Sequence, residues 1–205
     1  TAGTLDVNDL TLSINGNTVI NGGTMKSGTN TVTFGDAGAD SVTISSGSFE
    51  VESDAPGTDI VKTATTWTNS GGTITYNAAT GITANVLTGL APYFNLTFNS
   101  SGSTYSLAAI TDVDGTLTLT AGTLDVSGTN YGMTVGAGWT DTGAGTFTEG
   151  SGTVTFDGTG TVNSNEAFEN VGIAGTVTLG AALDADGTLT LTSGSLDVSG
   201  TNYGI

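Results

Sequence analysis

Short alternations of apolar and polar residues recur along the whole chain, with an apolar centre about every seven residues. Two examples are Thr-Val-Thr-Phe at 153–156 and Thr-Val-Thr-Leu at 176–179. Because successive side chains of a strand point to opposite faces, these triplets place Val, Leu and Phe inward and Thr outward. Gly, Ser, Asn and Asp, which favour tight corners, separate the triplets. The pattern predicts strands of about three to five residues joined by short turns.

Strands this short suit a parallel β-solenoid better than a β-sandwich, in which turn signals come about every 8–12 residues. We therefore predict an all-β fold, a right-handed parallel β-helix with about three strands and roughly 18–24 residues in each coil. A tandem of small β-sandwiches is the alternative fold. No stretch carries the apolar stripe of an amphipathic helix, and the nearest approach to one is the Thr-rich region 59–68.

An internal repeat with a period of 72 residues supports the solenoid. The phrase Gly-Thr-Leu-Thr-Leu-Thr begins at Gly115 and again at Gly187, and Trp67 recurs as Trp139. The opening residues 1–7 also reproduce residues 120–126 almost letter for letter. We expect one continuous solenoid over 1–205, with a partial repeat at 1–42, copies at 43–114 and 115–186, and a further copy starting at 187–205. Each 72-residue unit would then form three or four coils.

The alternation also predicts which side chains form the core. The apolar members of four triplets should point inward and be buried, with the threonines between them exposed. The residues expected inside are Leu117, Leu119, Val154, Phe156, Val177, Leu179, Leu189 and Leu191.

Composition excludes several classes of partner and site. The formal charge is −17, from 19 acidic residues and two lysines, and the chain has no Arg, His or Cys. Two lysines do not supply the phosphate contacts of a nucleic-acid-binding protein. Without Cys and His there is no disulfide framework, no zinc or haem site of the usual kind and no Ser-His or Cys-His nucleophile. No apolar run reaches the length of about 18 residues that predicts a membrane-spanning helix.

The phrases Gly-Thr-Leu-Thr-Leu-Thr and Gly-Thr-Val-Thr-Phe-Asp-Gly resemble the β-strand repeats of large bacterial surface and secreted solenoid proteins. These include filamentous-haemagglutinin-type adhesins and autotransporter-like passengers. The resemblance covers nearly the whole chain, but it is one of style and carries no site motif. It implies an extracellular or cell-surface structural protein without a catalytic centre or cofactor.

Two Asp-x-Asp-Gly motifs are the candidate metal ligands. Closely spaced carboxylates can bind calcium, but neither motif continues to the Glu of an EF-hand loop, and the glycine-rich pattern of calcium solenoids is missing. A β-turn, in which Asp side chains bond the local backbone, is the interpretation we favour, so no metal site is predicted. The residues concerned are Asp112, Asp114, Asp184 and Asp186.

Repeated aromatic, threonine and acidic residues suggest three further sites. Trp67 and Trp139, like Tyr131 and Tyr203, are equivalent in the repeat; they either stack sugar rings or, as we favour, pack in the core. Thr-x-Thr triplets could form a hydroxyl array of the ice-binding type, yet their uneven spacing favours ordinary β propensity. A pair of carboxylates suited to glycoside hydrolysis is a further alternative among so many acids.

The favoured function is therefore that of a structural protein: a segment of a surface stalk, fibre or adhesin shaft that is not an enzyme. Its partners would be copies of itself end to end or further repeats of the same chain, because the sequence opens and closes inside a repeat. The alternative is a carbohydrate-binding module or polysaccharide-acting enzyme on a β-helix, with surface polysaccharide as partner. Ice binding through threonine ladders is a minor alternative.

Overall fold

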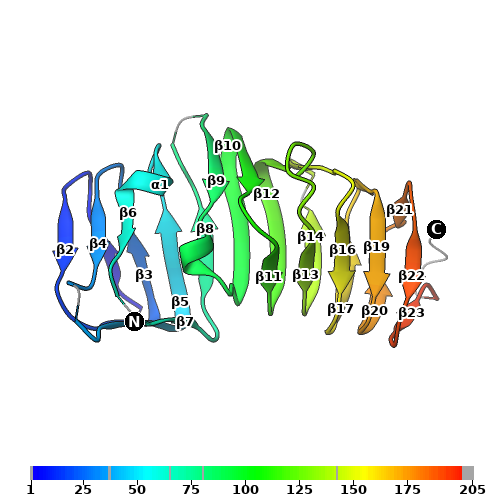
Figure 1. Ribbon diagram of the computed structural model, residues 1–205, viewed down its shortest axis with the longest axis horizontal. Helices are drawn as coiled ribbons and strands as arrows, with labels where there is room; N and C mark the ends of the chain where they lie inside the picture. The colour runs from blue at the N-terminus through cyan, green and yellow to red at the C-terminus, as the bar shows by residue number, and fades with distance from the viewer. Residues whose placement is uncertain (1, 37, 65, 80, 142, 200–205) are drawn as a thin grey trace.

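The alternating triplets form short parallel strands that stack side by side along one long axis (Figure 1). The computed structural model describes residues 2–36, 38–64, 66–79, 81–141 and 143–199. They form a right-handed parallel β-solenoid of about nine turns, with 56% strand and 4% helix. The predicted all-β solenoid is thus confirmed, and the tandem of β-sandwiches is not the fold.

The largest sheet contains thirteen strands and runs the full length of the solenoid. Ten of them follow one another as its rungs, and every pair is parallel. These rungs are β1 (Thr4–Asp6), β3 (Thr18–Lys26), β5 (Ser41–Val51), β8 (Thr73–Tyr76), β10 (Asn95–Leu107), β12 (Thr116–Asp125), β14 (Gly138–Asp141), β17 (Thr159–Asn163), β20 (Thr176–Leu179) and β23 (Ser195–Asp197). Three more strands pair beside this path: β7 (Thr66–Asn69), β9 (Thr83–Val86) and β15 (Gly145–Thr148).

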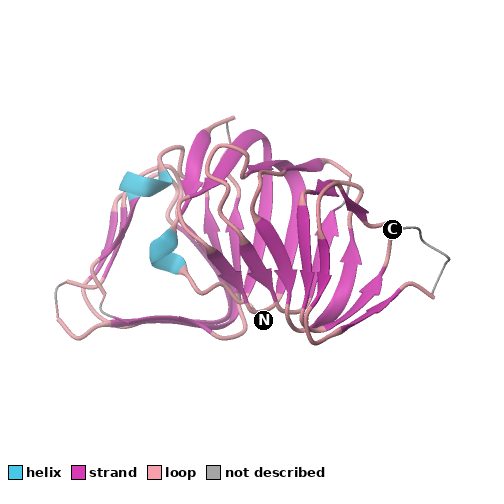
Figure 2. Cartoon of the chain, turned by 45° about the vertical axis from the view of Figure 1, so that its right-hand side comes forward, coloured by secondary structure: helices cyan, strands magenta, loops and turns pink. Residues whose placement is uncertain are grey.

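Three smaller parallel sheets complete the wall of the coil. The five-stranded sheet consists of β11 (Thr111–Val113), β13 (Met133–Val135), β16 (Thr153–Phe156), β19 (Asn170–Ile173) and β22 (Leu189–Leu191). The three-stranded sheet consists of β2 (Leu12–Ile14), β4 (Val32–Phe34) and β6 (Ile60–Lys62). The two-stranded sheet pairs β18 (Ala167–Phe168) with β21 (Asp184–Ala185). One α-helical turn, α1 (Pro56–Asp59), and one 3-10 turn, η1 (Thr88–Leu90), lie on the N-terminal half (Figure 2).

The core is a continuous stack of apolar side chains, with one or more from each rung. On the ten-rung path, the inward column is formed by Leu5, Met25, Phe49, Ile74, Leu96, Leu117, Trp139, Val162 and Leu179. All but Leu5 are buried. Each coil therefore packs on the coils before and after it, and stability comes from many similar contacts between neighbours.

Six of the eight predicted core residues are buried, and the two in β22 are the exceptions. Leu189 is only half-buried, and the side chain of Leu191 is 55% exposed, so the expectation that both are core residues is wrong. Strand β22 is the last rung of the five-stranded sheet within the described residues, where it pairs with β19. Its leucines are therefore packed from one side only.

The length of a coil varies along the solenoid. Consecutive rungs are offset by 17 residues at Val162 and Leu179 but by 25 at Phe49 and Ile74. The chain accommodates the difference in its corners, since the paired strands stay in register. The expected coil length is therefore close to the range observed.

The 72-residue repeat does not equal a whole number of coils. Leu117 pairs with Trp139 in the thirteen-stranded sheet. Its counterpart in the repeat, Leu189, pairs with Val171 in the five-stranded sheet. Three coils carry Leu117 only as far as Leu179, so the repeat spans more than three coils and fewer than four. Copies of one phrase therefore lie on different sides of the solenoid.

Four long strands bend sharply at a glycine, which lets one strand serve two sides of the coil. Gly47 in β5 has φ of +85°, and a Cβ atom there would lie 2.1 Å from the carbonyl oxygen of Gly23. A side chain is therefore excluded both by backbone conformation and by the neighbouring coil. The corresponding positive-φ glycines of β3, β10 and β12 are Gly22, Gly102 and Gly122.

Candidate functional site

The two Asp-x-Asp-Gly motifs lie in different sheets. Asp112 is in β11 and accepts a hydrogen bond from the Thr134 hydroxyl of the next rung. The pKa of Asp114 is raised by partial burial and by the neighbouring carboxylates of Asp112 and Asp157. Asp184, in β21, and Asp186, just after it, are both exposed. Across the described residues, no three or more acidic side chains are arranged to hold a metal ion.

Both tryptophans lie in the core. Trp67 is 8% exposed and Trp139 is fully buried. Each packs edge-on against phenylalanines: Trp67 against Phe34, and Trp139 against Phe147 and Phe168. The preference for a core role over sugar stacking thus agrees with their positions. Of the other repeated pair, Tyr131 is 39% exposed, and Tyr203 lies outside the described residues.

A buried pair of tyrosines joins β8 to the segment that contains η1. The hydroxyls of Tyr76 and Tyr93 are 3.2 Å apart. The Leu87 amide donates to Tyr76 at 2.8 Å, and Tyr93 donates to the Leu87 carbonyl at 2.6 Å. Burial raises the pKa of both phenols, so they stay protonated and act as a structural clamp. Nothing in the repeat pattern predicts this clamp, because its three segments are brought together only by the coil.

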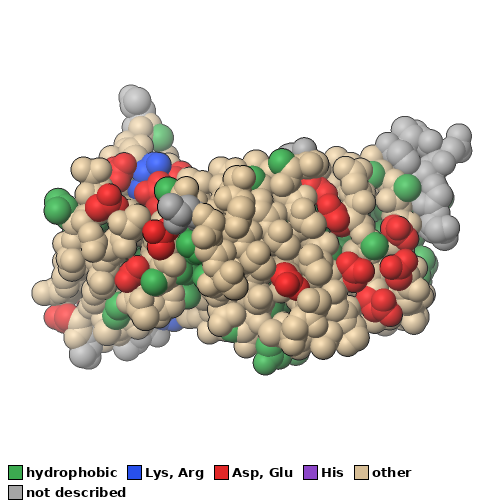
Figure 3. All heavy atoms as spheres, turned by 90° about the horizontal axis from the view of Figure 1, so that it is seen from above, with side chains coloured by type: hydrophobic (Ala, Val, Ile, Leu, Met, Phe, Trp, Pro, Cys, Tyr) green, Lys and Arg blue, Asp and Glu red, His purple; other side chains and the backbone are tan. Residues whose placement is uncertain are grey.

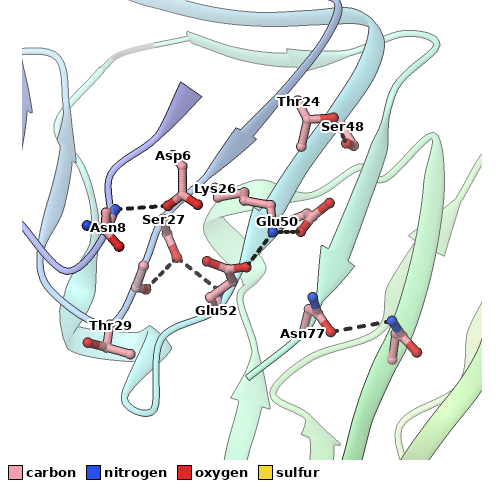
Figure 4. A network of polar contacts seen from close by, with 12 residues as sticks. Asp6, Asn8, Thr24, Lys26, Ser27, Thr29, Ser48, Glu50, Glu52 and Asn77 are labelled. Atoms are coloured by element: carbon pink, nitrogen blue, oxygen red, sulfur yellow. Dashed lines mark hydrogen bonds and ion pairs between the residues drawn. The ribbon is translucent and has the colours of Figure 1, made fainter. Parts of the chain in front are cut away.

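A charged column crosses the first three rungs of the large sheet, where Asp6, Lys26 and Glu50 are paired in register. The ammonium group of Lys26 lies 3.2 Å from Glu50 and 3.0 Å from Glu52 (Figure 4). The two glutamates raise the pKa of Lys26, chiefly through the hydrogen bond to Glu52. All three side chains are 21–29% exposed, so the group is a structural ion cluster at the outer surface of the sheet.

Replacing Lys26 by methionine is expected to destabilise the solenoid by about 1 kcal/mol, because two glutamates would be left facing each other without a counter-ion. The loss should shrink at about 1 M salt, where the Debye length is about 3 Å. Thermal melts of the variant and parent at low and high salt measure both effects. Lys62→Met is the matched control, since Lys62 is exposed and donates only to the carbonyl of Gly89. Equal losses in the two variants would contradict the prediction.

The acids nearest to a hydrolytic pair lie around β14 and β15. Asp141 is 7% exposed; one carboxylate oxygen accepts from the Gly143 amide at 2.8 Å, and the other has no hydrogen-bond partner within the described residues. Partial burial, together with Asp141 and Glu149, raises the pKa of Glu166. The hollow beside Glu149 has a volume of about 10 Å³, too small for a sugar ring. Figure 3 shows the acidic side chains in separate groups on a mostly uncharged surface.

The outer surface of six consecutive rungs, β8 to β20, presents threonine with some asparagine. We call it the threonine face, and its side chains alternate with the buried core residues of the same strands. The threonine face consists of Thr73, Thr75, Asn95, Thr97, Thr116, Thr118, Thr140, Thr159, Thr161, Asn163, Thr176 and Thr178.

No protein family, curated protein or solved structure matches this chain. Among the described residues, no helix is long and apolar enough to cross a membrane.

Proposed function

We propose that this chain is a shaft segment of an extracellular structural protein, such as a surface stalk, fibre or adhesin. Its partners are copies of itself end to end or further repeats of the same chain. The observation that carries the proposal is the continuous core, whose apolar side chains are uncovered at both end rungs. Leu5 and Val19 are 52% and 67% exposed at one end, and Leu191 and Val198 are 55% and 38% exposed at the other.

The N-terminal end is also hollowed. An open hollow of about 700 Å³ is lined there by Leu5, Ile14, Val19, Ile20 and Met25, together with neighbouring glycines. Core side chains that line an open hollow favour a partner that supplies another layer of the same kind. A further coil has the matching alternation of apolar and polar positions.

The two end rungs of the ten-rung path are suited to pair with each other. Leu196 of β23 and Leu5 of β1 are both in the inward register of the same sheet. A junction that continues this register would place Ser195 beside Thr4 and Leu196 beside Leu5. Such a head-to-tail contact repeats without closing and forms a filament. It would also place Asp197 beside Asp6, and like charges directly opposite are destabilising.

Light scattering at rising salt tests the proposal, because screening weakens the repulsion between Asp6 and Asp197. We expect the parent chain to assemble as salt is added. The double variant Asp6→Asn/Asp197→Asn should assemble at lower salt. Electron microscopy should show filaments one solenoid wide.

Asp112→Asn/Asp157→Asn is the matched control, since it removes the same charge far from both end rungs. It should assemble like the parent. Monomers of the parent and of both variants at every salt and protein concentration would overturn end-to-end assembly.

The alternative function, a carbohydrate-binding module or polysaccharide-acting enzyme, has less support. Sugar rings are bound by exposed aromatic platforms, and both tryptophans are buried in the core. Pull-down with insoluble polysaccharides tests this alternative directly.

A further inference from the structure

The threonine face is a regular two-dimensional grid. One column runs through Thr75, Thr97, Thr118 and Thr140, with one residue on each of four consecutive rungs and no break in register. Rungs lie about 4.8 Å apart, and alternate residues of a strand about 6.6 Å apart. The sequence alone suggests uneven spacing, because the triplets of all sides of the coil are mixed along the chain. Within this one sheet, the corners absorb the differences.

The threonine face carries no charge. Its twelve side chains include no Asp, Glu or Lys, although the chain has 19 acids and a net charge of −17. The charged column Asp6–Lys26–Glu50 ends two rungs before Thr97, and Asp197 lies one rung after Thr178. The acids are therefore placed on other sides of the coil and at the two ends of this sheet.

The hydroxyl groups of this surface are available to an external partner. Within the described residues, the column threonines Thr75, Thr97, Thr118 and Thr140 are half-buried by their neighbours, and their hydroxyls make no intramolecular hydrogen bond. Each threonine also presents a methyl group. The grid therefore alternates hydrogen-bonding and apolar points at fixed spacings, held by a rigid core of Ile74, Leu96, Leu117 and Trp139 beneath.

A ligand that uses such a grid must repeat in two dimensions. A small molecule would cover one or two rungs, and a single polymer chain would repeat along one direction only. Sugar rings would need aromatic platforms, and this surface has none. Charged groups would hold strongly oriented hydration water, whereas neutral hydroxyls and methyls at fixed spacing leave water free to adopt the order of a crystal. From these points we propose that the threonine face binds ice.

Thermal hysteresis and crystal shape, observed on a single ice crystal in the purified parent protein, test the proposal. We expect faceted crystals, a freezing point below the melting point and enrichment of the protein in slowly grown ice. The double variant Thr97→Lys/Thr118→Lys should lose these effects, because two bulky charges would interrupt the middle of the grid. The isosteric Thr97→Val/Thr118→Val variant keeps the shape and removes two hydroxyls, and it should show reduced activity.

The matched control is Thr134→Lys/Thr155→Lys on β13 and β16. These two threonines are also half-buried and neighbours on adjacent rungs, but they belong to the five-stranded sheet. The control should keep the activity of the parent, and circular dichroism must show that all variants are folded. Absence of ice shaping by the parent, or equal loss in both lysine variants, would overturn the proposal. Binding to crystalline cellulose or chitin without an effect on ice would also overturn it and assign the surface to a polysaccharide.

Discussion

Phe156→Asp is expected to lower the free energy of unfolding by several kcal/mol, enough to unfold much of the chain at room temperature. Phe156 is 2% exposed, packs edge-on against Phe168 and lies between Val135 and Ile173 of the neighbouring rungs. Truncating a buried phenylalanine costs about 3–5 kcal/mol. The variant adds a carboxylate that has no partner in an apolar interior. An ordinary domain has a stability of only about 5–15 kcal/mol.

Urea unfolding followed by tryptophan fluorescence measures this loss, and Phe156→Ala provides a value if the aspartate variant does not fold. Leu191→Asp is the control, because Leu191 is also an apolar strand residue of the five-stranded sheet but is 55% exposed. Its midpoint should stay close to that of the parent, within about 0.5 kcal/mol. Similar midpoints for Phe156→Asp and the parent would show that Phe156 is not a core residue.

Gly160→Ala should destabilise the solenoid by about 3 kcal/mol, although it adds a single methyl group. A Cβ atom at Gly160 would lie 0.8 Å from the carbonyl oxygen of Ala137 in the coil before it. The obstacle is backbone, so no side chain can rotate away, and the strand pairing of β14 with β17 must shift. Differential scanning calorimetry should show a clear fall in melting temperature.

Gly128→Ala is the matched control for this substitution. A Cβ atom at Gly128 would meet nothing within 4 Å, so its melting temperature should hardly change. Equal melting temperatures for Gly160→Ala and Gly128→Ala would mean that neighbouring coils are packed less closely than described.

The alternation of the triplets is enough to predict the fold class and most of the core, because it depends only on which residues alternate. Leu117, Val154 and Phe156 are predicted inside on this basis, and all three are buried. Leu191 shows the limit of the method, since alternation gives the direction of a side chain but not whether a neighbouring coil covers it.

Register between coils is the part that the sequence does not predict. Corners differ in length, so the partner of each strand is decided by packing over the whole coil and not by a fixed spacing. The clamp of Tyr76 and Tyr93 depends on such a partnership, as does the alignment of Thr97 with Thr118. For this reason the threonine triplets appear scattered along the chain and become a grid only in three dimensions.

The mismatch between the 72-residue repeat and the coil bears on how such a chain can grow. The same phrase serves as a rung of the thirteen-stranded sheet at Leu117 and of the five-stranded sheet at Leu189. A duplicated stretch of gene therefore need not encode complete coils, because each strand-and-corner module is accepted on any side of the wall. The inheritable unit of this architecture is then the single strand with its corner, and lengthening by unequal recombination preserves the fold at almost any breakpoint between strands.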